Sequence, residues 1–495
     1  MIAVSRTLSL DRPLDQLTPD ELQHAADAIV RWAFTQHETL SSQSVGNTAE
    51  PAELKPLLDL PAPDRPIPFE DIFRCFNNHV AGHALRLNHP RFLAFVPGAP
   101  SFPSILGDWL TAAANFFGGV WLEAAGPTQV ELTVINWFKD WLGFPPSAEG
   151  LLTSGGSEAN LTALVVARDA VPPEERSRHV LYVGEQRHWS IDRAARIVGL
   201  LPQQICVIPG ADDVCTHADA LMDAIAADRE AGLLPWAFVA NAGATNTGSV
   251  DPLDELAEVC RREKLWLHVD AAYGWAAILT DEGKQKLRGI ERADSITFDP
   301  HKWFAQTFEA GGLLVRRGGV LADSFAMRPD YLQDTAPEHD EINVADRGVA
   351  LTRRFRALKI WLSVQMLGLD WYRDLAERCL RLAEYAEVKL REAGFEIVHP
   401  RQLSIVCFRW VPDDPEKADE VNRRIVHELL EGGQAFLSST MLFGKVTLRI
   451  CFINWRTTTA DVDQVIALMR AVVTDGQVES TFLTSSPPLQ GRGPG

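Results

Sequence analysis

A lysine and an aspartate stand at the ends of two apolar segments that could be neighbouring strands. Lys302 follows SITFDPH (295–301), and Asp270 ends LWLHVD (265–270). Partial burial disfavours the charged form of a lysine, and an uncharged amine can form a Schiff base with an aldehyde. A carboxylate such as Asp270 could keep the ring nitrogen of a bound cofactor protonated. Taken singly, Lys302 could be a surface lysine, and Asp270 could form a structural pair or a metal site with His268.

Two further motifs lie upstream of these residues. LLTSGGSEAN (151–160) runs from a strand-like segment through two glycines into a helix. Glycines let the backbone approach an anion, and the first N–H groups of a helix point towards it. We predict that Ser157 caps this helix and binds a phosphate. His188 follows an apolar segment and precedes a helix, where its flat imidazole could stack on a ring. Alone, these motifs could be an ordinary capped helix and a solvated histidine.

These four features gain meaning from their order along the chain. A phosphate site, a stacking histidine, an aspartate for a ring nitrogen and a Schiff-base lysine follow one another. Each stands at the end of an expected strand. One ligand explains all four, because pyridoxal phosphate (PLP) combines an anionic phosphate, a flat ring, a basic ring nitrogen and an aldehyde.

Elements that could position these residues alternate between strand and helix. Short apolar segments occur at 179–184, 204–210, 236–243, 265–272, 295–300 and 311–317. Amphipathic helical patterns separate them, which is typical of an α/β fold with a mostly parallel sheet covered by helices on both faces. Ligands of such sheets bind at the carboxyl ends of the strands.

The chain divides into four expected parts. Residues 1–88 form an N-terminal arm that is partly helical, with an N-cap at Thr18, and extended through a proline-rich passage at 51–68. Residues 89–352 form the PLP-binding large domain, and residues 353–475 form a smaller α+β domain that begins with a long helix. Residues 476–495 are low in apolar content, which is typical of a disordered tail.

The chain resembles the group II PLP-dependent decarboxylases, the family of aromatic-amino-acid, glutamate and cysteine-sulfinate decarboxylases. The matching segments are HPRFLAFVPGAPSFPSILGDWL, TSGGSEANLTAL, HWSIDRAA, WLHVDAAYG, DPHKW, RPDYL and RRFRALKIW. They extend from His89 to Trp361, and a weaker match continues through LSIVCFRW and VTLRICF.

The resemblance implies a fold-type I PLP enzyme that forms a homodimer with its active site at the subunit interface. It implies that Lys302 holds PLP as a Schiff base, that Asp270 pairs with the pyridinium nitrogen and that His188 stacks on the ring. The other cofactor-binding residues that it implies are Gly156, Ser157, Thr245, Ala272, Asp299 and His301. Asp299 stands where the family's phosphate ligand is often asparagine, and an acidic side chain beside a phosphate requires compensation.

Tyr331, in RPDYL, resembles the tyrosine of the family's mobile catalytic loop. The resemblance implies that Tyr331 protonates the α-carbon of the quinonoid after CO₂ leaves. In relatives that act as aldehyde synthases this tyrosine is replaced, usually by phenylalanine, and oxygen intercepts the quinonoid instead. The tyrosine and His188 therefore favour α-decarboxylation of an L-amino acid to the amine and CO₂.

An aromatic-rich segment between residues 92 and 121 matches the part of the family that lines the substrate side chain. The predicted substrate residues are Phe95, Pro97, Trp121 and His301. They favour an aromatic or bulky apolar substrate, although aromatic residues also commonly build a core.

Two positions depart from the aromatic-amino-acid branch of the family. Gly98 stands where these enzymes commonly carry a hydroxyl residue, and Trp189 where they commonly carry serine. The HWSI pattern resembles the glutamate and cysteine-sulfinate branch. An acidic amino-acid decarboxylase therefore stays open as an alternative, as does a PLP-dependent aldehyde synthase.

The composition excludes other classes of partner. The 495 residues carry a net charge of −19, which disfavours nucleic acid and anionic membrane surfaces. No apolar stretch is long enough to span a membrane, and no signal peptide stands out at the N-terminus. Seven dispersed cysteines are typical of free thiols in a reducing compartment, so we expect a cytoplasmic protein.

Two classes of protein that do not use PLP are alternatives. A metal-dependent hydrolase could use His268, Asp270 and His301 as ligands, but Lys302 and the glycine loop would then have no role. A non-catalytic relative could have kept the fold as a binding scaffold. We predict no metal site, because no open coordination position with a general base is evident.

Overall fold

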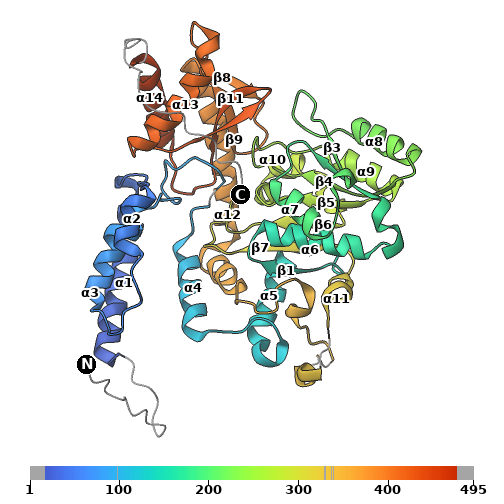
Figure 1. Ribbon diagram of the computed structural model, residues 1–495, viewed down its shortest axis with the longest axis horizontal. Coiled ribbons are helices and arrows are strands. Elements are labelled where there is room, and N and C mark those ends of the chain that lie inside the picture. The colour runs from blue at the N-terminus through green and yellow to red at the C-terminus, as the bar shows by residue number, and fades with distance from the viewer. Residues whose placement is uncertain (1–16, 97, 328–329, 336, 338, 476–495) are drawn as a thin grey trace. The chain divides into compact units, whose positions relative to one another are not determined.

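Seven strands form one sheet in the larger part of the chain, in the order β1-β7-β6-β5-β4-β2-β3 (Figure 1). The computed structural model describes residues 17–96, 98–327, 330–335, 337 and 339–475. The strands are β1 (Glu149–Thr153), β2 (His179–Gly184), β3 (Ile205–Ile208), β4 (Leu234–Asn241), β5 (Trp266–Asp270), β6 (Ser295–Phe298) and β7 (Gly311–Val315). Strands β3, β2, β4, β5 and β6 are parallel, and β7 is antiparallel to β6 and β1. The predicted α/β fold with a mostly parallel sheet is confirmed.

Both faces of this sheet are buried under helices. On β2, Leu181 and Val183 pack with α6 (Gly156–Asp169) and α7 (Trp189–Ile197), whereas Val180 and Tyr182 pack in the core that contains residues of α5, α8 and α9. Alternate side chains of a strand point to opposite faces, so a strand covered on both sides must be apolar throughout. The continuous apolar segments of the sequence have this cause.

Further helices complete the larger part of the chain. They are α4 (Phe102–Ala114), α5 (Trp121–Trp141), α8 (Ala218–Glu230), α9 (Leu253–Glu263), α10 (Asp281–Lys286) and α11 (Val320–Phe325). A buried ion pair joins Glu131 of α5 to Arg353, with 2.5 Å between Oε1 and Nη2, and the same oxygen accepts the N–H of Leu152 on β1. These contacts fix α5 against the edge of the sheet.

The direction of the strands decides where polar loops meet. Because β1, β2, β4, β5 and β6 run the same way, their carboxyl ends lie at one edge of the sheet. Strand β7 runs the other way and therefore begins at this edge, at Gly311. The segments that follow five strands are thus brought together, as expected for a ligand site of an open α/β sheet.

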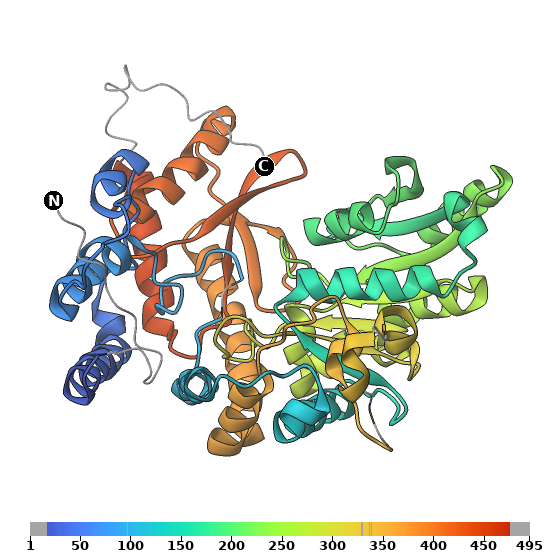
Figure 2. The same cartoon turned by 60° about the horizontal axis from the view of Figure 1, so that its bottom comes forward.

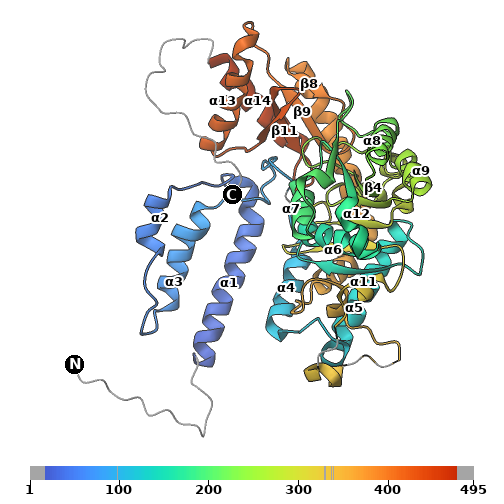
Figure 3. The same cartoon turned by 45° about the vertical axis from the view of Figure 1, so that its right-hand side comes forward.

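A second sheet of four antiparallel strands follows, in the order β10-β11-β9-β8. Its strands are β8 (Glu396–His399), β9 (Ile405–Arg409), β10 (Ser438–Leu442) and β11 (Lys445–Cys451), accompanied by α13 (Ala418–Glu431) and α14 (Thr459–Asp475), which contact each other (Figure 3). The long helix α12 (Ala357–Glu392), which is kinked at Gly368, contacts α4 and α5 of the larger part of the chain and β8 and β9 of the second sheet (Figure 2). The predicted strands β9 and β11 are present, whereas β8 and β10 gave no recognisable pattern because both are partly exposed.

The chain separates into two compact units, Met1–Leu85 and Arg86–Gly495. In the first unit, α1 (Pro19–Thr39) and α3 (Phe69–Cys75) lie side by side (Figure 3). The two helices contact through the rings of His24 and Phe69, and Trp32 of α1 packs against Phe76. Thr18 caps α1 as predicted. The prediction of an extended passage from residue 51 is wrong for α2 (Pro51–Leu58), because Pro51 occupies the first helical turn, where its missing N–H costs nothing.

Other predicted boundaries are left as predictions. The division between a large and a small domain at 352/353 is not tested by this two-unit separation, and the tail at 476–495 lies outside the described residues. No helix in the described part of the chain is long and apolar enough to cross a lipid bilayer.

Candidate active site

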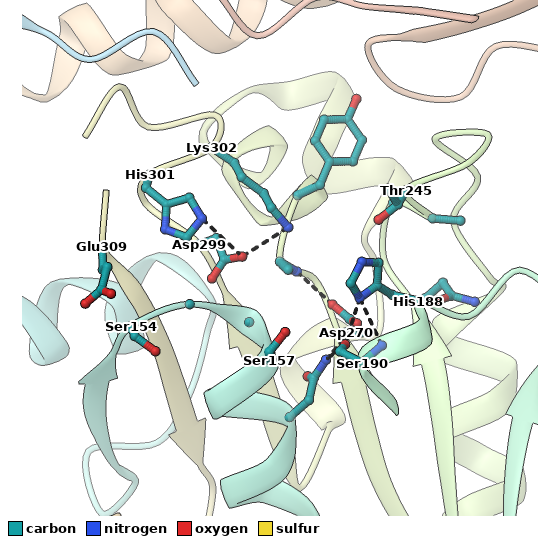
Figure 4. A pocket seen from close by; sticks show the side chains of 18 residues that line it. Ser154, Ser157, His188, Ser190, Thr245, Asp270, Asp299, His301, Lys302 and Glu309 are labelled. Carbon is teal, nitrogen blue, oxygen red and sulfur yellow. Dashed lines mark hydrogen bonds and ion pairs between the residues drawn. The ribbon is translucent and has the colours of Figure 1, made fainter. Parts of the chain in front are cut away.

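A cavity of about 360 Å³ opens at the carboxyl edge of the large sheet (Figure 4). Its lining comes from the segments that follow β1, β2, β4, β5 and β6. The lining residues are Ser154, Gly155, Gly156, Ser157, Asn160, His188, Ser190, Asn241, Gly243, Ala244, Thr245, Asp270, Ala272, Tyr273, Asp299, His301, Lys302 and Glu309. The structure thus brings together every residue that the sequence predicted to bind the cofactor.

Lys302 lies in the turn after β6, beside a buried carboxylate. Its Nζ is 3.0 Å from Asp299 Oδ2, and His301 Nε2 is 3.7 Å from the same oxygen (Figure 4). Asp299 is buried, and its Oδ1 accepts no hydrogen bond from the described residues. Burial lowers the pKa of His301, although the Asp299 carboxylate opposes this shift. The amine is therefore held at the cavity by a neighbouring negative charge.

Gly98 explains one departure from the expected family pattern. A Cβ added to Gly98 would lie 2.2 Å from the carbonyl oxygen of Lys302 and 2.3 Å from that of His301. Such distances to backbone atoms are far shorter than van der Waals contact. A glycine at this position lets the segment before α4 pass directly against the turn that carries the lysine.

The loop between β1 and α6 forms an open cup. Gly155, not the predicted Ser157, is the N-cap of α6, and Ser157 lies exposed in the first turn. The prediction was wrong because the helical hydrogen bonds begin two residues earlier, where the N–H groups of Glu158 and Ala159 both donate to Gly155 O at 3.1 Å. Glu158 also folds back and accepts hydrogen bonds from Ser154 N at 2.7 Å and Ser154 Oγ at 2.6 Å. A Cβ on Gly156 would lie 3.0 Å from Asp299 Oδ2. The missing side chain keeps the cup open towards the free N–H groups of the helix.

Asp270 and His188 lie on another part of the cavity wall. Asp270 Oδ1 accepts the N–H of Ala272 at 3.1 Å, and Oδ2 accepts from Asn160 Nδ2 at 3.0 Å. His188 caps α7 and lies 2.8 Å from Ser190 through Nδ1 and Oγ. Burial lowers the pKa of His188, while the charge of Asp270 raises it. The wall therefore presents a hydrogen-bonded carboxylate next to an imidazole whose neutral form is favoured.

Several residues in or beside the cavity were not predicted from the sequence, among them Asn160, Arg449 and Glu309. Asn160 reaches Asp270 from within a helix, where a polar residue ordinarily faces solvent. Arg449 of β11 donates to the carbonyl oxygens of Thr245 at 2.7 Å and Phe95 at 3.2 Å. Glu309 lines the cavity from the loop before β7. No local pattern signals these roles, because their partners lie far away along the chain.

The predicted substrate residues are only partly placed at the cavity. His301 lines it, whereas Phe95 is exposed and lines an adjacent cavity with Trp189 and Arg449. Among the described residues, Trp121 lines neither of these two cavities. Its backbone N–H donates to Asn343 Oδ1.

Two other predicted residues cannot be placed by their side chains. Pro97 lies outside the described residues. Tyr331 lies in a short 3₁₀ helix (Asp330–Thr335), and the structure describes its backbone alone. The substrate and proton-donor roles of these residues stay predictions.

The residues present fit PLP better than a metal ion. The glycine cup leaves room for a phosphate, Asp270 offers an acceptor for a ring N–H, and Lys302 offers an amine. Both nitrogens of His268 are hydrogen bonded, to Ser295 Oγ and Asn160 Oδ1. The described residues contain no group of three His, Cys, Asp or Glu side chains arranged for a metal. The geometry gives no support to the metal-dependent hydrolase.

Comparisons with known proteins agree with this fit. The conserved domain of pyridoxal-dependent decarboxylases matches residues 51–411. An aromatic-L-amino-acid decarboxylase of Bacillus atrophaeus is 40% identical over 462 residues, covering 92% of this chain and 96% of the relative. A phenylacetaldehyde synthase of Arabidopsis thaliana is 29% identical, covering 88% and 92%. A crystal structure of Oryza sativa TDC with PLP and tryptamine superimposes with a TM-score of 0.88 at 28% identity, covering 94% of this chain and 100% of that chain.

The glycine cup generates a prediction about cofactor affinity. In Gly156→Ala, the new methyl group would crowd Asp299 and Ala272 at the mouth of the helix N-terminus. We expect the Kd for PLP to rise about 10- to 100-fold, since one or two hydrogen bonds to the phosphate would be weakened. Titration of the unloaded protein with PLP, followed by absorbance, measures this change.

The matched control is Gly126→Ala. Gly126 is an exposed glycine of α5, and a Cβ there would meet no atom within 4 Å. Its PLP affinity should equal that of the wild type. Equal affinities in both variants would contradict a phosphate site at the cup.

Proposed function

Because the chain belongs to the pyridoxal-dependent decarboxylase family, we propose that it removes the α-carboxyl group of an aromatic L-amino acid. The products are the corresponding amine and CO₂. The observation that carries this proposal is the meeting of Lys302, Asp270, His188 and the glycine cup around one cavity.

Each group of the cavity has a task that its chemistry permits. When bound, PLP supplies an aldehyde for amines and a ring that accepts the electron pair released with CO₂. Lys302 holds the cofactor through Nζ and orients it in the cavity. The carboxylate of Asp270 keeps a proton on the ring nitrogen, which preserves the ring's capacity to accept electrons. Ser157 and the N–H groups of α6 bind the phosphate.

The remaining residues control the faces of the site and the final proton. When PLP is bound, His188 would stack on one face of the ring; burial lowers the pKa of His188, so its neutral form would add no competing positive charge there. Tyr331 donates a proton to the α-carbon, where the bond to the carboxyl group has broken. One proton thus replaces CO₂ at the α-carbon, which keeps the electron pair of the broken bond, so the reaction needs no external oxidant or reductant.

An aromatic side chain is supported by what surrounds the adjacent cavity. The exposed rings of Phe95 and Trp189 line it. Both arginines of this lining already have partners: Arg187 pairs with Asp192, and Arg449 donates to backbone carbonyls. An acidic substrate would need a cation for its second carboxylate, so these contacts favour the aromatic class named by the Bacillus relative.

We also propose that the active form is a cytoplasmic homodimer. Apolar residues Leu22, Ile29 and Val30 of α1 are exposed in the single chain, and their i, i+7, i+8 spacing places them on one helical face. Covering such a face with a second copy would bury it. All seven cysteines are free, as expected in a reducing compartment. A purified protein that is monomeric yet fully active would contradict the dimer.

The central prediction concerns Lys302. The wild-type protein should be yellow and release CO₂ from one of a panel of amino acids, with the largest rates for tryptophan, tyrosine or phenylalanine. Lys302→Ala should lose the absorption band of covalently held PLP and lower kcat by at least about 10³-fold, because no other group can replace the amine. Visible spectra and trapping of CO₂ measure both effects. A wild-type protein that cannot be loaded with PLP would overturn the proposal.

The second candidate function is that of an aldehyde synthase, as in the Arabidopsis relative. A substitution at Tyr331 distinguishes it from decarboxylation. In Tyr331→Phe the ring remains but the acidic hydroxyl is lost. We expect amine formation to fall about 10²- to 10⁴-fold, the usual contribution of a positioned acid. O₂ should then be consumed and aldehyde, ammonia and H₂O₂ released with CO₂. Amine analysis and an oxygen electrode distinguish the two reactions, and aldehyde from the wild type would favour the synthase.

A further inference from the structure

A connected set of buried polar side chains lies behind Asp270 and His188. Asn160 on α6, Ser190 on α7, His268 on β5 and Ser295 on β6 are each at most 2% exposed. Such groups must find their hydrogen-bond partners within the protein, because unpaired polar atoms are costly in a buried site. The groups around this set decide which atom of each member carries a proton.

The carboxylate of Asp270 fixes the direction of the hydrogen bonds at one end of this set of side chains. An ionised carboxylate can only accept, so the Nδ2 of Asn160 must face Oδ2, at 3.0 Å. The Oδ1 of Asn160 then faces His268 Nε2, also at 3.0 Å, and Nε2 must carry a proton. Burial lowers the pKa of His268 to about 4, so the ring is neutral and its Nδ1 is an acceptor. One amide therefore fixes the tautomer of a histidine.

Trp266, at the other end of the set, independently fixes the same direction of the hydrogen bonds. The indole Nε1 of Trp266 can only donate, and it lies 2.9 Å from Ser295 Oγ. The hydroxyl hydrogen of Ser295 is thereby free to point at His268 Nδ1, at 2.8 Å. Indole and carboxylate thus agree on a single arrangement of protons.

A branch from Asn160 reaches His188. The second hydrogen of its amide points at Ser190 Oγ, at 3.0 Å. Ser190 Oγ can then donate to His188 Nδ1 at 2.8 Å, and the backbone N–H of Ser190 also points at this nitrogen, at 3.3 Å. In neutral His188, the proton must therefore reside on Nε2.

From this geometry we propose that Asn160, His268 and Ser190 are positioning residues, which set the orientation of the Asp270 carboxylate and the proton-bearing nitrogen of His188. The inference rests on the proposed function, in which both groups contact PLP. One amide controls both of them, so the ring nitrogen and the ring face meet groups that are already oriented. A role limited to fold stability would affect unfolding without affecting the cofactor.

The experiment compares three substitutions at two members of the set, Asn160 and His268, in protein loaded with PLP. Asn160→Asp keeps the shape and the oxygen facing His268, but places an oxygen against Asp270. His268→Met removes both ring nitrogens, whereas His268→Gln keeps a donor where Nε2 stands. The readouts are the Kd for PLP, the absorption band of bound PLP, kcat and KM, and the midpoint of thermal unfolding.

We expect the Kd for PLP to rise about 10- to 100-fold in Asn160→Asp and in His268→Met, the usual effect of removing a partner that orients a binding group. The absorption band should shift and kcat should fall more than KM rises. His268→Gln should restore most of the affinity that His268→Met loses. Such rescue would not follow from a packing role, since methionine fills the site as well as glutamine.

Asn422→Asp is the matched control. Asn422 is a fully buried amide of α13 that donates to the carbonyls of Trp410 and Ala418. Its replacement should lower the unfolding midpoint and leave the PLP affinity of the folded protein unchanged. Should Asn160→Asp fail to fold, the His268 pair decides alone.

Two results would overturn the inference in distinguishable ways. Wild-type PLP affinity, band and kcat in Asn160→Asp and His268→Met would refute the positioning role while leaving the proposed function intact. A wild-type protein that neither binds PLP nor releases CO₂ would refute both.

Discussion

Burial of the large sheet on both faces is the constraint on which the rest of the structure depends. Since α6 and α7 cover one face and α5, α8 and α9 the other, the strand interiors must be apolar. Polar chemistry is therefore displaced to the strand ends. Because β1, β2, β4, β5 and β6 share one direction, the polar residues after them collect at one edge and surround one cavity.

The few polar groups that remain inside the sheet layers have a particular arrangement. Asn160, His268 and Ser295 join α6 to β5 and β6 by hydrogen bonds in which each of these donors meets an acceptor. These bonds replace hydration that burial removes. They also connect the helix whose N-terminus forms the phosphate cup to the strand that ends in Asp270. Packing and site geometry are thus set by the same contacts.

The sequence predicted much of the fold and the membership of the cavity, for identifiable reasons. The strands β2, β4, β5, β6 and β7 gave continuous apolar segments because both their faces are covered. The exposed edge strand β10 gave none, since only part of it is buried. Ser157 satisfied the composition of an N-cap, but the N-cap is Gly155, two residues earlier, whose carbonyl oxygen accepts the N–H groups of Glu158 and Ala159. Helical periodicity does not locate such a start.

The sequence by itself determined the chemical types of the site: a lysine, an aspartate, a histidine and a glycine loop in a fixed order at strand ends. These follow from local patterns, because apolar segments and turn residues lie next to one another along the chain. Only the tertiary structure decided that Asn160 orients Asp270, that Arg449 holds Thr245 and Phe95, and that Gly98 packs against Lys302. The partners in these contacts are 110 or more residues apart for Asn160, and 204 and 354 for Arg449, so their meeting depends on strand order and helix packing, which local sequence does not encode.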